Sequence, residues 1–187
     1  MGDTVNLTIY YPIGMCIFVL VKINLDMSFQ TADLYDEHIG QVDVCLPVFK
    51  SFGQKARFYG EIVTIKCFED NALVGDILRQ ENGKGKVLVI DGGASLRCAL
   101  VGDKIAEAAV KNKWEGIIVY GCIRDSAVIN TMNIGIRALN TNPTKTVKRK
   151  TGLLNETVNF ANVTFQPGAY VYVDEDGILV SSVSLII

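Results

Sequence analysis

Two short apolar runs, separated by a segment with helical spacing, constrain this chain more than any other feature of its sequence. Residues 87–90 read Val-Leu-Val-Ile before an Asp-Gly-Gly turn, and residues 116–121 form a second run rich in β-branched side chains. Uninterrupted apolar runs of this length are typical of strands covered on both faces, as in a parallel sheet. Between them, residues 104–111 place isoleucine and alanine on one face of a predicted helix. Strand, helix and strand in this order indicate a right-handed crossover and an α/β fold.

The flanking segments extend this pattern in both directions. Residues 61–68 alternate enough to predict a strand, and residues 72–78 have apolar side chains at helical spacing. Nearer the N-terminus, Thr31 is a candidate cap for a helix whose first turn is acidic. Residues 163–180 hold short β-rich segments separated by Pro-Gly and Asp-Gly turns, which predict antiparallel strands after the α/β part.

The length of 187 residues allows one domain with its own core and is too short for two ordinary domains. Residues 4–21 carry no charge, but they contain Asn6, Pro12 and Gly14 and lack a basic flank, which disfavours a membrane helix or a signal peptide. We therefore expect a domain over residues 27–187, preceded by an apolar extension over residues 1–26 to which the pattern assigns no role. We expect no membrane span.

Charge and residue content exclude several classes of function. The formal net charge of −2 and the pI near 5.4 give no overall basic footprint, so we expect no direct binding of nucleic acid. With His38 as the single histidine, one subunit cannot build a zinc site of two or three histidines. The five cysteines are odd in number and form no Cys-x-x-Cys pair, which favours buried thiols and a reducing cytoplasm over disulfides.

Two loops that follow the predicted buried strands carry the candidate chemistry, since α/β folds place ligands beyond such strands. Gly102 and Asp103 precede the predicted helix, with Asp103 as its candidate N-cap. Backbone N–H groups in the first turn of a helix have no intrahelical acceptors and can hold a carboxylate or phosphate. Arg124 offers a planar fork of donors to the same anion, and Asp125 can hold a hard cation such as Mg²⁺. Together they suit a small acid chelated to a metal.

Each of these features also has a purely structural interpretation. A Gly-Asp pair before a helix is commonly a turn and a cap. Adjacent Arg124 and Asp125 commonly form a surface ion pair worth less than about 1 kcal/mol. The basic run at residues 145–150 is interpreted as a solvated loop rather than a site for polyanions. Periodicity alone leaves both interpretations open.

The same loops lie within longer stretches that resemble a known family. Residues 87–103 read VLVIDGGASLRCALVGD, and residues 116–125 read GIIVYGCIRD. They resemble the family of the regulator of ribonuclease activity A (RraA-like), which also contains the class II 4-hydroxy-4-methyl-2-oxoglutarate aldolases. Its hallmark is an Asp, twenty intervening residues and Arg-Asp, which Asp103, Arg124 and Asp125 match. Other matching stretches extend the resemblance to about residues 28–181, namely residues 31–34, 133–139, 163–168 and 174–180.

The resemblance implies a swivelling α/β sandwich with mixed sheets and flanking helices. It also implies a ring-shaped homotrimer with active sites between subunits. A pyruvate-like 2-oxo acid is then bound by the first turn of the helix and the arginine of the motif, that is by Gly102, Asp103, Lys104, Ile105 and Arg124. Asp125 is then the protein ligand of a divalent metal, Mg²⁺ or Mn²⁺. These roles agree with the chemistry expected of the two loops.

The implied reaction is retro-aldol cleavage of 4-hydroxy-4-methyl-2-oxoglutarate to two pyruvates, with decarboxylation of oxaloacetate through the same pyruvate enolate. The 2-oxo acid chelates the metal, which acts as a Lewis acid while the carbon–carbon bond breaks. Arg124 and the helix N-terminus hold the carboxylate. A base must take the proton from the C4 hydroxyl, and Asp103 acting through a water is the candidate. The expected catalytic residues are therefore Asp103 and Arg124.

One position departs from the family pattern, and a second function stays open. Many aldolase members carry an acidic residue three positions after the motif Asp, where this chain has Val128. The departure puts the outer support of the metal, or the acid–base group, in doubt. The alternative function is a non-catalytic regulator that binds and inhibits a ribonuclease of the RNA-degradation machinery. The intact Asp103, Arg124 and Asp125 favour the enzyme, while Val128 favours regulation or a narrower decarboxylase activity.

Overall fold

The computed structural model describes residues 29–186, so the extension expected over residues 1–26 lies outside the described residues. Within this part the helices are α1 (Thr31–Glu37), α2 (Ala72–Gln80), α3 (Asp103–Lys111) and α4 (Ser126–Ile129). The strands are β1 (Val42–Val44), β2 (Lys50–Phe52), β3 (Phe58–Lys66), β4 (Lys86–Asp91), β5 (Ala99–Val101), β6 (Gly116–Ile123), β7 (Gly135–Thr141), β8 (Leu153–Leu154), β9 (Val158–Phe160), β10 (Val163–Phe165), β11 (Tyr170–Val173) and β12 (Ile178–Ser181). None of the helices in residues 29–186 is long and apolar enough to cross a membrane.

One mixed sheet holds most of these strands. Its order is β1-β12-β11-β3-β4-β6-β7-β2, with β5 beside β6 and β8 beside β3. The central strands β3, β4, β6 and β7 are parallel neighbours, whereas β11, β12 and β1 at one edge and β2 at the other pair in antiparallel fashion. β9 and β10 form a separate antiparallel pair. The predicted parallel strands and antiparallel C-terminal strands are therefore both present, and the pairing of β11 with β3 joins them into one sheet.

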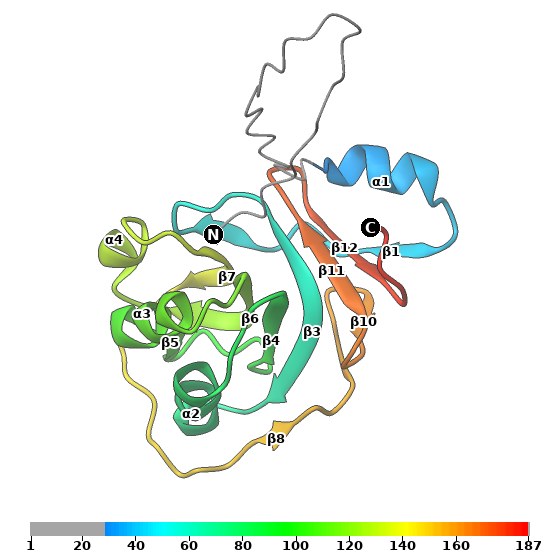
Figure 1. The fold of residues 1–187 in the computed structure, drawn as a ribbon. Helices are drawn as coiled ribbons and strands as arrows, with labels where there is room; N and C mark the ends of the chain where they lie inside the picture. The colour runs from blue at the N-terminus through cyan, green and yellow to red at the C-terminus, as the bar shows by residue number, and fades with distance from the viewer. Residues whose placement is uncertain (1–28, 187) are drawn as a thin grey trace, which may run out of the picture.

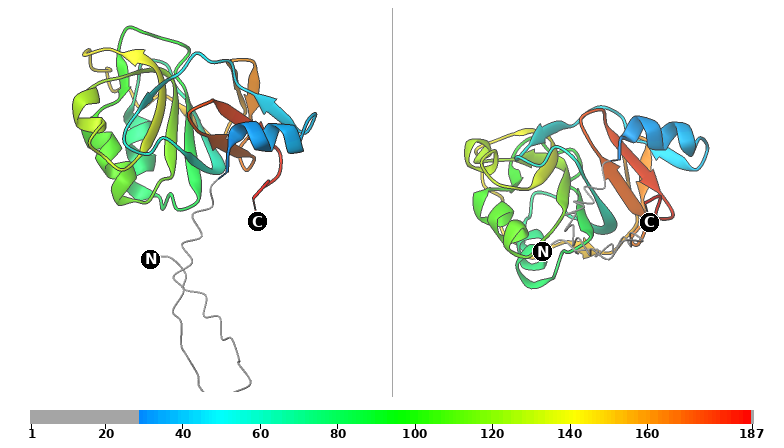
Figure 2. Two further views of the ribbon diagram at one scale, coloured as in Figure 1. Left: turned by 90° about the horizontal axis from the view of Figure 1, so that it is seen from above. Right: turned by 45° about the horizontal axis from the view of Figure 1, so that its top comes forward.

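The central strands are covered on both faces, which accounts for their continuous apolar runs. Leu88 and Ile90 of β4 and Ile117 of β6 belong to the buried cluster that includes α2 and α3. Val87 and Val89 belong instead to the cluster that includes β9 and β10. Figures 1 and 2 show α2, α3 and α4 together on one side of the sheet, with β10 on the other. Burying one such side chain contributes roughly 1.5–3 kcal/mol, so neither face tolerates a polar substitution in these strands.

The first helix, α1, packs against the antiparallel edge of the sheet, on β11 and β12. The prediction that Thr31 caps this helix is wrong, because Gln30 occupies the N-cap position and Thr31 is the first helical residue. The Thr31 hydroxyl donates instead to Asp174 Oδ1 at 2.6 Å, and the Thr31 N–H donates to Asp174 Oδ2 at 2.7 Å. The Thr31 side chain therefore bonds to Asp174, 143 residues away, and does not cap the helix as the local pattern predicts.

Candidate active site

The two loops predicted to carry the chemistry lie side by side at one end of the parallel strands. β5 pairs in parallel with β6, and the backbone N–H of Arg124 donates to the carbonyl of Val101 at 2.9 Å. The chain therefore enters α3 next to the point where it leaves β6 for α4. The Asp motif and the Arg-Asp motif therefore lie next to each other at the ends of the neighbouring strands β5 and β6. Ligands of α/β sheets usually bind at such strand ends.

Asp125 has an unusual backbone conformation for a residue before a helix. Its φ of 56° lies in the left-handed region, which aspartate tolerates better than most residues. Its carboxylate does not cap α4, and Oδ2 lies 3.2 Å from Arg124 Nε and 3.4 Å from the backbone nitrogen of Asp103. The side chains of Arg124 and Asp125 are 27% and 36% exposed. The turn therefore directs an accessible carboxylate away from its own helix and toward the start of α3.

Gly102 leaves the space in which this ion pair lies. A Cβ atom at this position would be 2.9 Å from Asp125 Oδ2 and 3.1 Å from Arg124 Nε. The backbone there is extended, with φ of −128°, so any residue could adopt the conformation. Crowding by the Arg124 and Asp125 side chains is thus the reason for a glycine.

The N–H groups in the first turn of α3 already have acceptors. Gly102 occupies the N-cap position and Asp103 is the first helical residue, which corrects the prediction that Asp103 is the N-cap. Asp103 Oδ1 accepts a hydrogen bond from the N–H of Lys104 at 2.7 Å, and the N–H of Ile105 donates to the Gly102 carbonyl at 3.1 Å. The Asp103 carboxylate therefore occupies the place at which an anionic ligand would meet this helix N-terminus.

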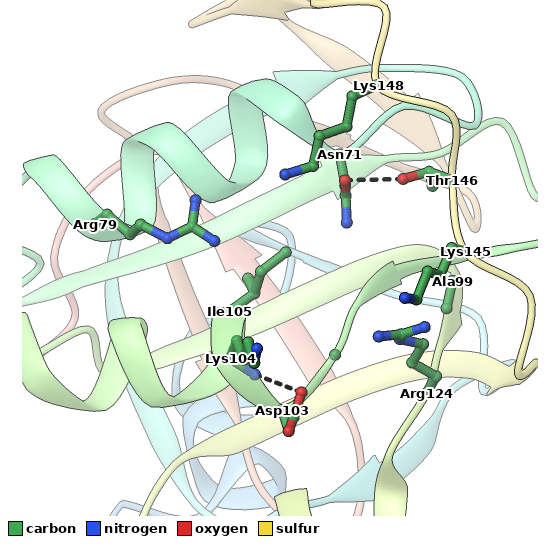
Figure 3. Close-up of a pocket in the computed structure, with 11 residues that line it drawn as sticks. Asn71, Arg79, Ala99, Asp103, Lys104, Ile105, Arg124, Lys145, Thr146 and Lys148 are labelled. Carbon is green, nitrogen blue, oxygen red and sulfur yellow. Dashed lines mark hydrogen bonds between the residues drawn. The ribbon is translucent and has the colours of Figure 1, made fainter.

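A pocket of about 270 Å³ lies beside this first turn (Figure 3). Its charge is one-sided, because Asp103 is the single acidic side chain among the described residues that line it. Cationic side chains reach it from α2, from α3, from the loop after β6 and from the segment after β7, namely Arg79, Lys104, Arg124, Lys145 and Lys148. The chain as a whole has a net charge of −2, so this concentration of positive charge is local. It suits an anionic ligand, above all one with more than one carboxylate.

Two of these cations belong to the basic run at residues 145–150, for which the sequence predicts a solvated loop. All four basic side chains of this run are exposed, as the prediction states, and Arg149 and Lys150 do not line the pocket. Lys145 and Lys148 are exposed to solvent and also line the pocket, which the local pattern does not indicate. No local signal separates the two pairs, because the contacts that place this segment come from the turn before α2, 75 to 81 residues earlier.

The carboxylates around Arg124 fit a divalent cation that keeps much of its water. Within residues 29–186, His, Cys, Asp and Glu side chains form no group of three or more that could hold a metal ion. Asp125 is partly exposed, and its Oδ1 atom accepts no hydrogen bond from the described residues. Mg²⁺ is commonly bound by one or two carboxylates, with water and substrate oxygens completing the octahedron. Asp125, with Asp103 nearby, meets that requirement.

Val128, at the position that departs from the family pattern, lies in α4 and is 48% exposed. Its backbone N–H donates to the carbonyl of Asp125 at 3.0 Å, so it lies one turn after the proposed ligand. Valine offers neither a charge nor a proton donor. Neither an outer contact to a metal nor acid–base chemistry can come from this side chain.

The described cysteines take no part in the pocket. Cys45, Cys67, Cys98 and Cys122 are buried and free. Burial raises the pKa of Cys45 and of Cys67 to about 12, and it also raises the pKa of Cys98 and Cys122. These thiols stay protonated at neutral pH and are poor nucleophiles. The prediction of buried thiols is confirmed for these four, while Cys16 lies outside the described residues.

Comparison with known proteins gives a consistent set of relatives. The sequence matches the RraA-like family, described as Aldolase/RraA, over residues 31–180. A protein of Dechloromonas aromatica (strain RCB) is 57% identical over 163 residues, which cover 85% of this chain and 99% of that one. A protein of Aromatoleum aromaticum is 52% identical over 160 residues, which cover 86% and 100%. Both carry the provisional name 4-hydroxy-4-methyl-2-oxoglutarate aldolase.

Two solved structures share the fold at substantial identity. The RNA-processing inhibitor RraA from Thermus thermophilis superimposes with a TM-score of 0.80 at 40% identity, covering 83% of this chain and 94% of that one. A structure named S-adenosylmethionine: 2-dimethylmenaquinone methyltransferase from Geobacillus kaustophilus HTA426 gives 0.82 at 43% identity, covering 84% and 97%. The expected mixed α/β fold is therefore confirmed. The two structures carry different functional names although they share the fold, so function has to be argued from the site.

Proposed function

The chain belongs to the RraA-like family, and we propose that it is a divalent-metal-dependent lyase that cleaves 4-hydroxy-4-methyl-2-oxoglutarate to two pyruvates. It would also decarboxylate oxaloacetate through the same pyruvate enolate. The observation that carries the proposal is the placement of Arg124 and the start of α3 around one cationic pocket, with the Asp125 carboxylate in contact with both. Both substrates are 2-oxo dicarboxylates, which match a pocket with an excess of positive charge.

In this proposal, Arg124 and the first turn of α3 bind the carboxylate next to the 2-oxo group. Asp103 Oδ1 accepts from the N–H of Lys104 in the free site, so an arriving carboxylate takes the place of Asp103 at that donor. The turn closed by Ile105 and Gly102 keeps the backbone in position for this exchange. Arg124 contacts Asp125 through Nε, which leaves its terminal nitrogens for the substrate. Substrate binding and release of the Asp103 side chain are thereby coupled.

The released Asp103 carboxylate is the proposed base, acting through a water on the C4 hydroxyl. Loss of that proton turns C4 into the 2-oxo carbon of the first pyruvate as the bond between C3 and C4 breaks. The electron pair of this bond passes toward the 2-oxo group of the other fragment, which becomes the second pyruvate when C3 takes up a proton. Arg124 stays on its carboxylate throughout, so Asp103 and Arg124 are the proposed catalytic residues.

Asp125 is the proposed protein ligand of Mg²⁺ or Mn²⁺, which supplies Lewis acidity for the negative charge that develops on the 2-oxo oxygen. Its unengaged Oδ1 atom and its partial exposure support this role. The contact from Arg124 Nε at 3.2 Å orients the carboxylate. A neighbouring residue that fixes a ligand in this way normally contributes to metal affinity.

A coupled assay of pyruvate release tests the proposal directly. The protein is given 4-hydroxy-4-methyl-2-oxoglutarate or oxaloacetate with Mg²⁺ or Mn²⁺, then with a chelator, and then with metal restored. We expect chelator-sensitive release from both substrates. No chelator-sensitive release from either substrate would overturn the assignment. Release from oxaloacetate alone would reduce it to a decarboxylase, the outcome that Val128 favours.

A second candidate function is regulation of a ribonuclease, since one structural neighbour is named as an inhibitor of RNA processing. The observation that favours it is Val128, which brings no acid to the position after Asp125. The two functions are separated by the variant Asp125→Ala in an RNA-cleavage assay with a ribonuclease of the degradation machinery. A regulator keeps its inhibition in this variant, whereas a lyase loses turnover and shows no inhibition to begin with.

The resemblance further supports a ring-shaped homotrimer with active sites between subunits, formed by a domain over residues 27–187 in the cytoplasm. The buried, protonated thiols are consistent with a reducing compartment. Light scattering on the full chain should give three times the 20.5 kDa of one chain. A monomer or dimer at micromolar concentration would contradict the trimer without affecting the chemistry argued above.

A further inference from the structure

Four cationic side chains of the pocket lack a countercharge within the part of the chain that the structure describes. None of the ion pairs found there involves Arg79, Lys104, Lys145 or Lys148. Like charges gathered around one pocket repel each other, and an anion between them removes that cost. The first carboxylate of a substrate is already accounted for by Arg124 and the start of α3. The remaining cations therefore call for a second anionic group.

Arg79 reaches the pocket because α2 carries a glycine one turn earlier. A Cβ atom at Gly75 would lie 2.6 Å from Arg79 Nη1. Glycine within a helix costs about 1 kcal/mol relative to alanine, and here it makes room for the guanidinium to fold back along the helix. Figure 3 shows the guanidinium of Arg79 and the ammonium of Lys148 directed into the same space, with Asn71 beside it. Cations from two elements thus face one part of the pocket.

The segment over residues 142–152 is fastened in place by a buried carboxylate. Asp70 is 0% exposed, and its Oδ2 atom accepts from the backbone N–H groups of Arg149 and Thr151, each at 2.9 Å. Its Oδ1 atom accepts from the N–H of Ala72 at the start of α2, also at 2.9 Å. Burial opposes ionisation of Asp70, but these hydrogen bonds outweigh it and hold its pKa below the ordinary value. The anchor is therefore charged at neutral pH and ties the segment to α2.

A second set of bonds holds the same segment nearer the pocket. The Thr146 hydroxyl donates to Asn71 Oδ1 at 2.8 Å, and Asn71 Nδ2 donates to the carbonyl of Leu100 at 3.1 Å. The N–H of Ala99 donates to the carbonyl of Thr144 at 2.9 Å. These bonds hold the backbone on either side of Lys145, and the bonds to Asp70 hold it just after Lys148. The two lysines are thus presented by a fixed backbone.

From these contacts we propose that Lys145, Lys148 and Arg79 form a subsite for the second carboxylate of a 2-oxo dicarboxylate, with Asp70 as the residue that positions residues 142–152 over it. The position of the first carboxylate rests on the proposed function. Arg79 offers a planar fork to the carboxylate and the lysines add point charges from the opposite side. The subsite selects dicarboxylates over monocarboxylates of the same length.

Binding of two matched ligands tests the subsite without requiring turnover. 2-Oxoglutarate and 2-oxopentanoate have the same chain length and differ only in a terminal carboxylate or methyl group. Titration calorimetry with Mg²⁺ present should show 2-oxoglutarate binding at least about tenfold more tightly to the full chain. Lys148→Met should remove most of that preference and leave 2-oxopentanoate binding unchanged, while Lys148→Arg should keep it. Lys111→Met, an exposed lysine at the end of α3, is the matched control and should behave as the natural chain.

Two outcomes would overturn the subsite. One is equal affinity of the natural chain for both ligands, and the other is an equal loss of both ligands in Lys148→Met. Either result leaves the lyase proposal standing if pyruvate release is observed. Conversely, a carboxylate preference that Lys148→Met abolishes supports the subsite even if neither 4-hydroxy-4-methyl-2-oxoglutarate nor oxaloacetate is cleaved.

The positioning role of Asp70 has its own test. Asp70→Asn should weaken 2-oxoglutarate binding several-fold and leave 2-oxopentanoate binding unchanged, since only the segment over the second carboxylate moves. In a Lys148→Met background the same change should have little further effect. If Asp70→Asn fails to fold, Thr151→Val serves as the test variant instead. It removes one anchoring bond, which the Thr151 hydroxyl donates to Asp70 at 3.1 Å. Additive losses in the double variant, or equal losses of both ligands, would show a merely structural role.

Discussion

Arg137 and Arg124 each lie beside an aspartate, but they differ in burial and in the number of hydrogen bonds that they make. Arg137 is 5% exposed, and its guanidinium donates to a serine hydroxyl and to two backbone carbonyls, one of them from Asp174. The Arg124 side chain is 27% exposed, and its guanidinium is paired only with Asp125 among the described residues. Burying a charge is tolerated where hydrogen bonds compensate it, as they do around Arg137. The Arg124 guanidinium has few hydrogen-bond partners among the described residues, and its free donors can therefore bind a ligand.

The two aspartates repeat the contrast. Asp174 is 3% exposed and accepts from the N–H and hydroxyl of Thr31 and from the N–H of Asp176. Asp125 has a left-handed backbone, is 36% exposed and keeps one oxygen without a partner among the described residues. A strained and incompletely bonded group is commonly part of a functional site, whereas a saturated one holds the fold together. Residue type alone does not separate the two, and hydrogen-bond satisfaction does.

The largest expected effect comes from removing the proposed metal ligand. Asp125→Ala should lower metal-dependent turnover by at least about 100-fold, because the cation loses its protein carboxylate. Thermal unfolding should change little, since the carboxylate makes few contacts with the described residues. Pyruvate release is measured over a Mg²⁺ titration. Unchanged turnover at limiting metal would contradict the assignment of Asp125.

The corresponding change in the saturated pair should act on stability instead. Asp174→Ala removes the acceptor for the Thr31 N–H and hydroxyl and should destabilise the fold by about 3 kcal/mol, because buried donors lose their partner. Denaturant unfolding measures the loss, with Asp36→Ala on the exposed face of α1 as the control. A loss no larger than that of the control would show that the Asp174 contacts contribute little.

Gly102→Ala should have an intermediate effect on activity. The new Cβ atom lies 2.9 Å from Asp125 Oδ2 and must displace the ion pair. We expect turnover to fall about tenfold while the unfolding midpoint stays close to that of the natural chain, since the backbone there is ordinary. Gly177→Ala, where an added Cβ meets nothing within 4 Å, is the matched control. Equal activity of the two variants would show that the spacing at Gly102 is not needed.

The smallest effect concerns acid stability. Burial opposes ionisation of Asp70 and Asp174, but hydrogen bonds to the carboxylates outweigh it and lower the pKa of each. Such groups add stability that is fully present above the unfolded pKa of about 4 and is lost as the pH falls through the folded pKa. The free energy of unfolding should therefore decrease below about pH 4, and decrease less steeply in Asp174→Asn. Parallel pH profiles for the two proteins would refute this contribution.

Much of the fold and of the candidate site could be predicted from the order of residues along the chain. The strands at residues 87–90 and 116–121 are recognisable because both faces of a buried strand must be apolar. The loop at Arg124 is recognisable because it follows such a strand, and the loop at Gly102 is recognisable because it precedes a helix between the two strands. The contact of Thr31 with Asp174 and the position of Lys145 and Lys148 at the pocket could not be predicted, since the bonds that fix these segments come from residues 75 to 143 positions away.

By itself, the sequence determined the alternation of strands and helices and the pairing of an Asp with an Arg-Asp motif, because these depend on local periodicity and spacing. Only the tertiary structure decided which charges share a pocket. It placed the exposed Lys145 and Lys148 at the same pocket as Arg79, with the buried Asp70 holding their segment, while the equally exposed Arg149 and Lys150 do not line that pocket. Hydrogen bonds between segments distant in the sequence fix these positions, and the local pattern does not indicate which residues form them.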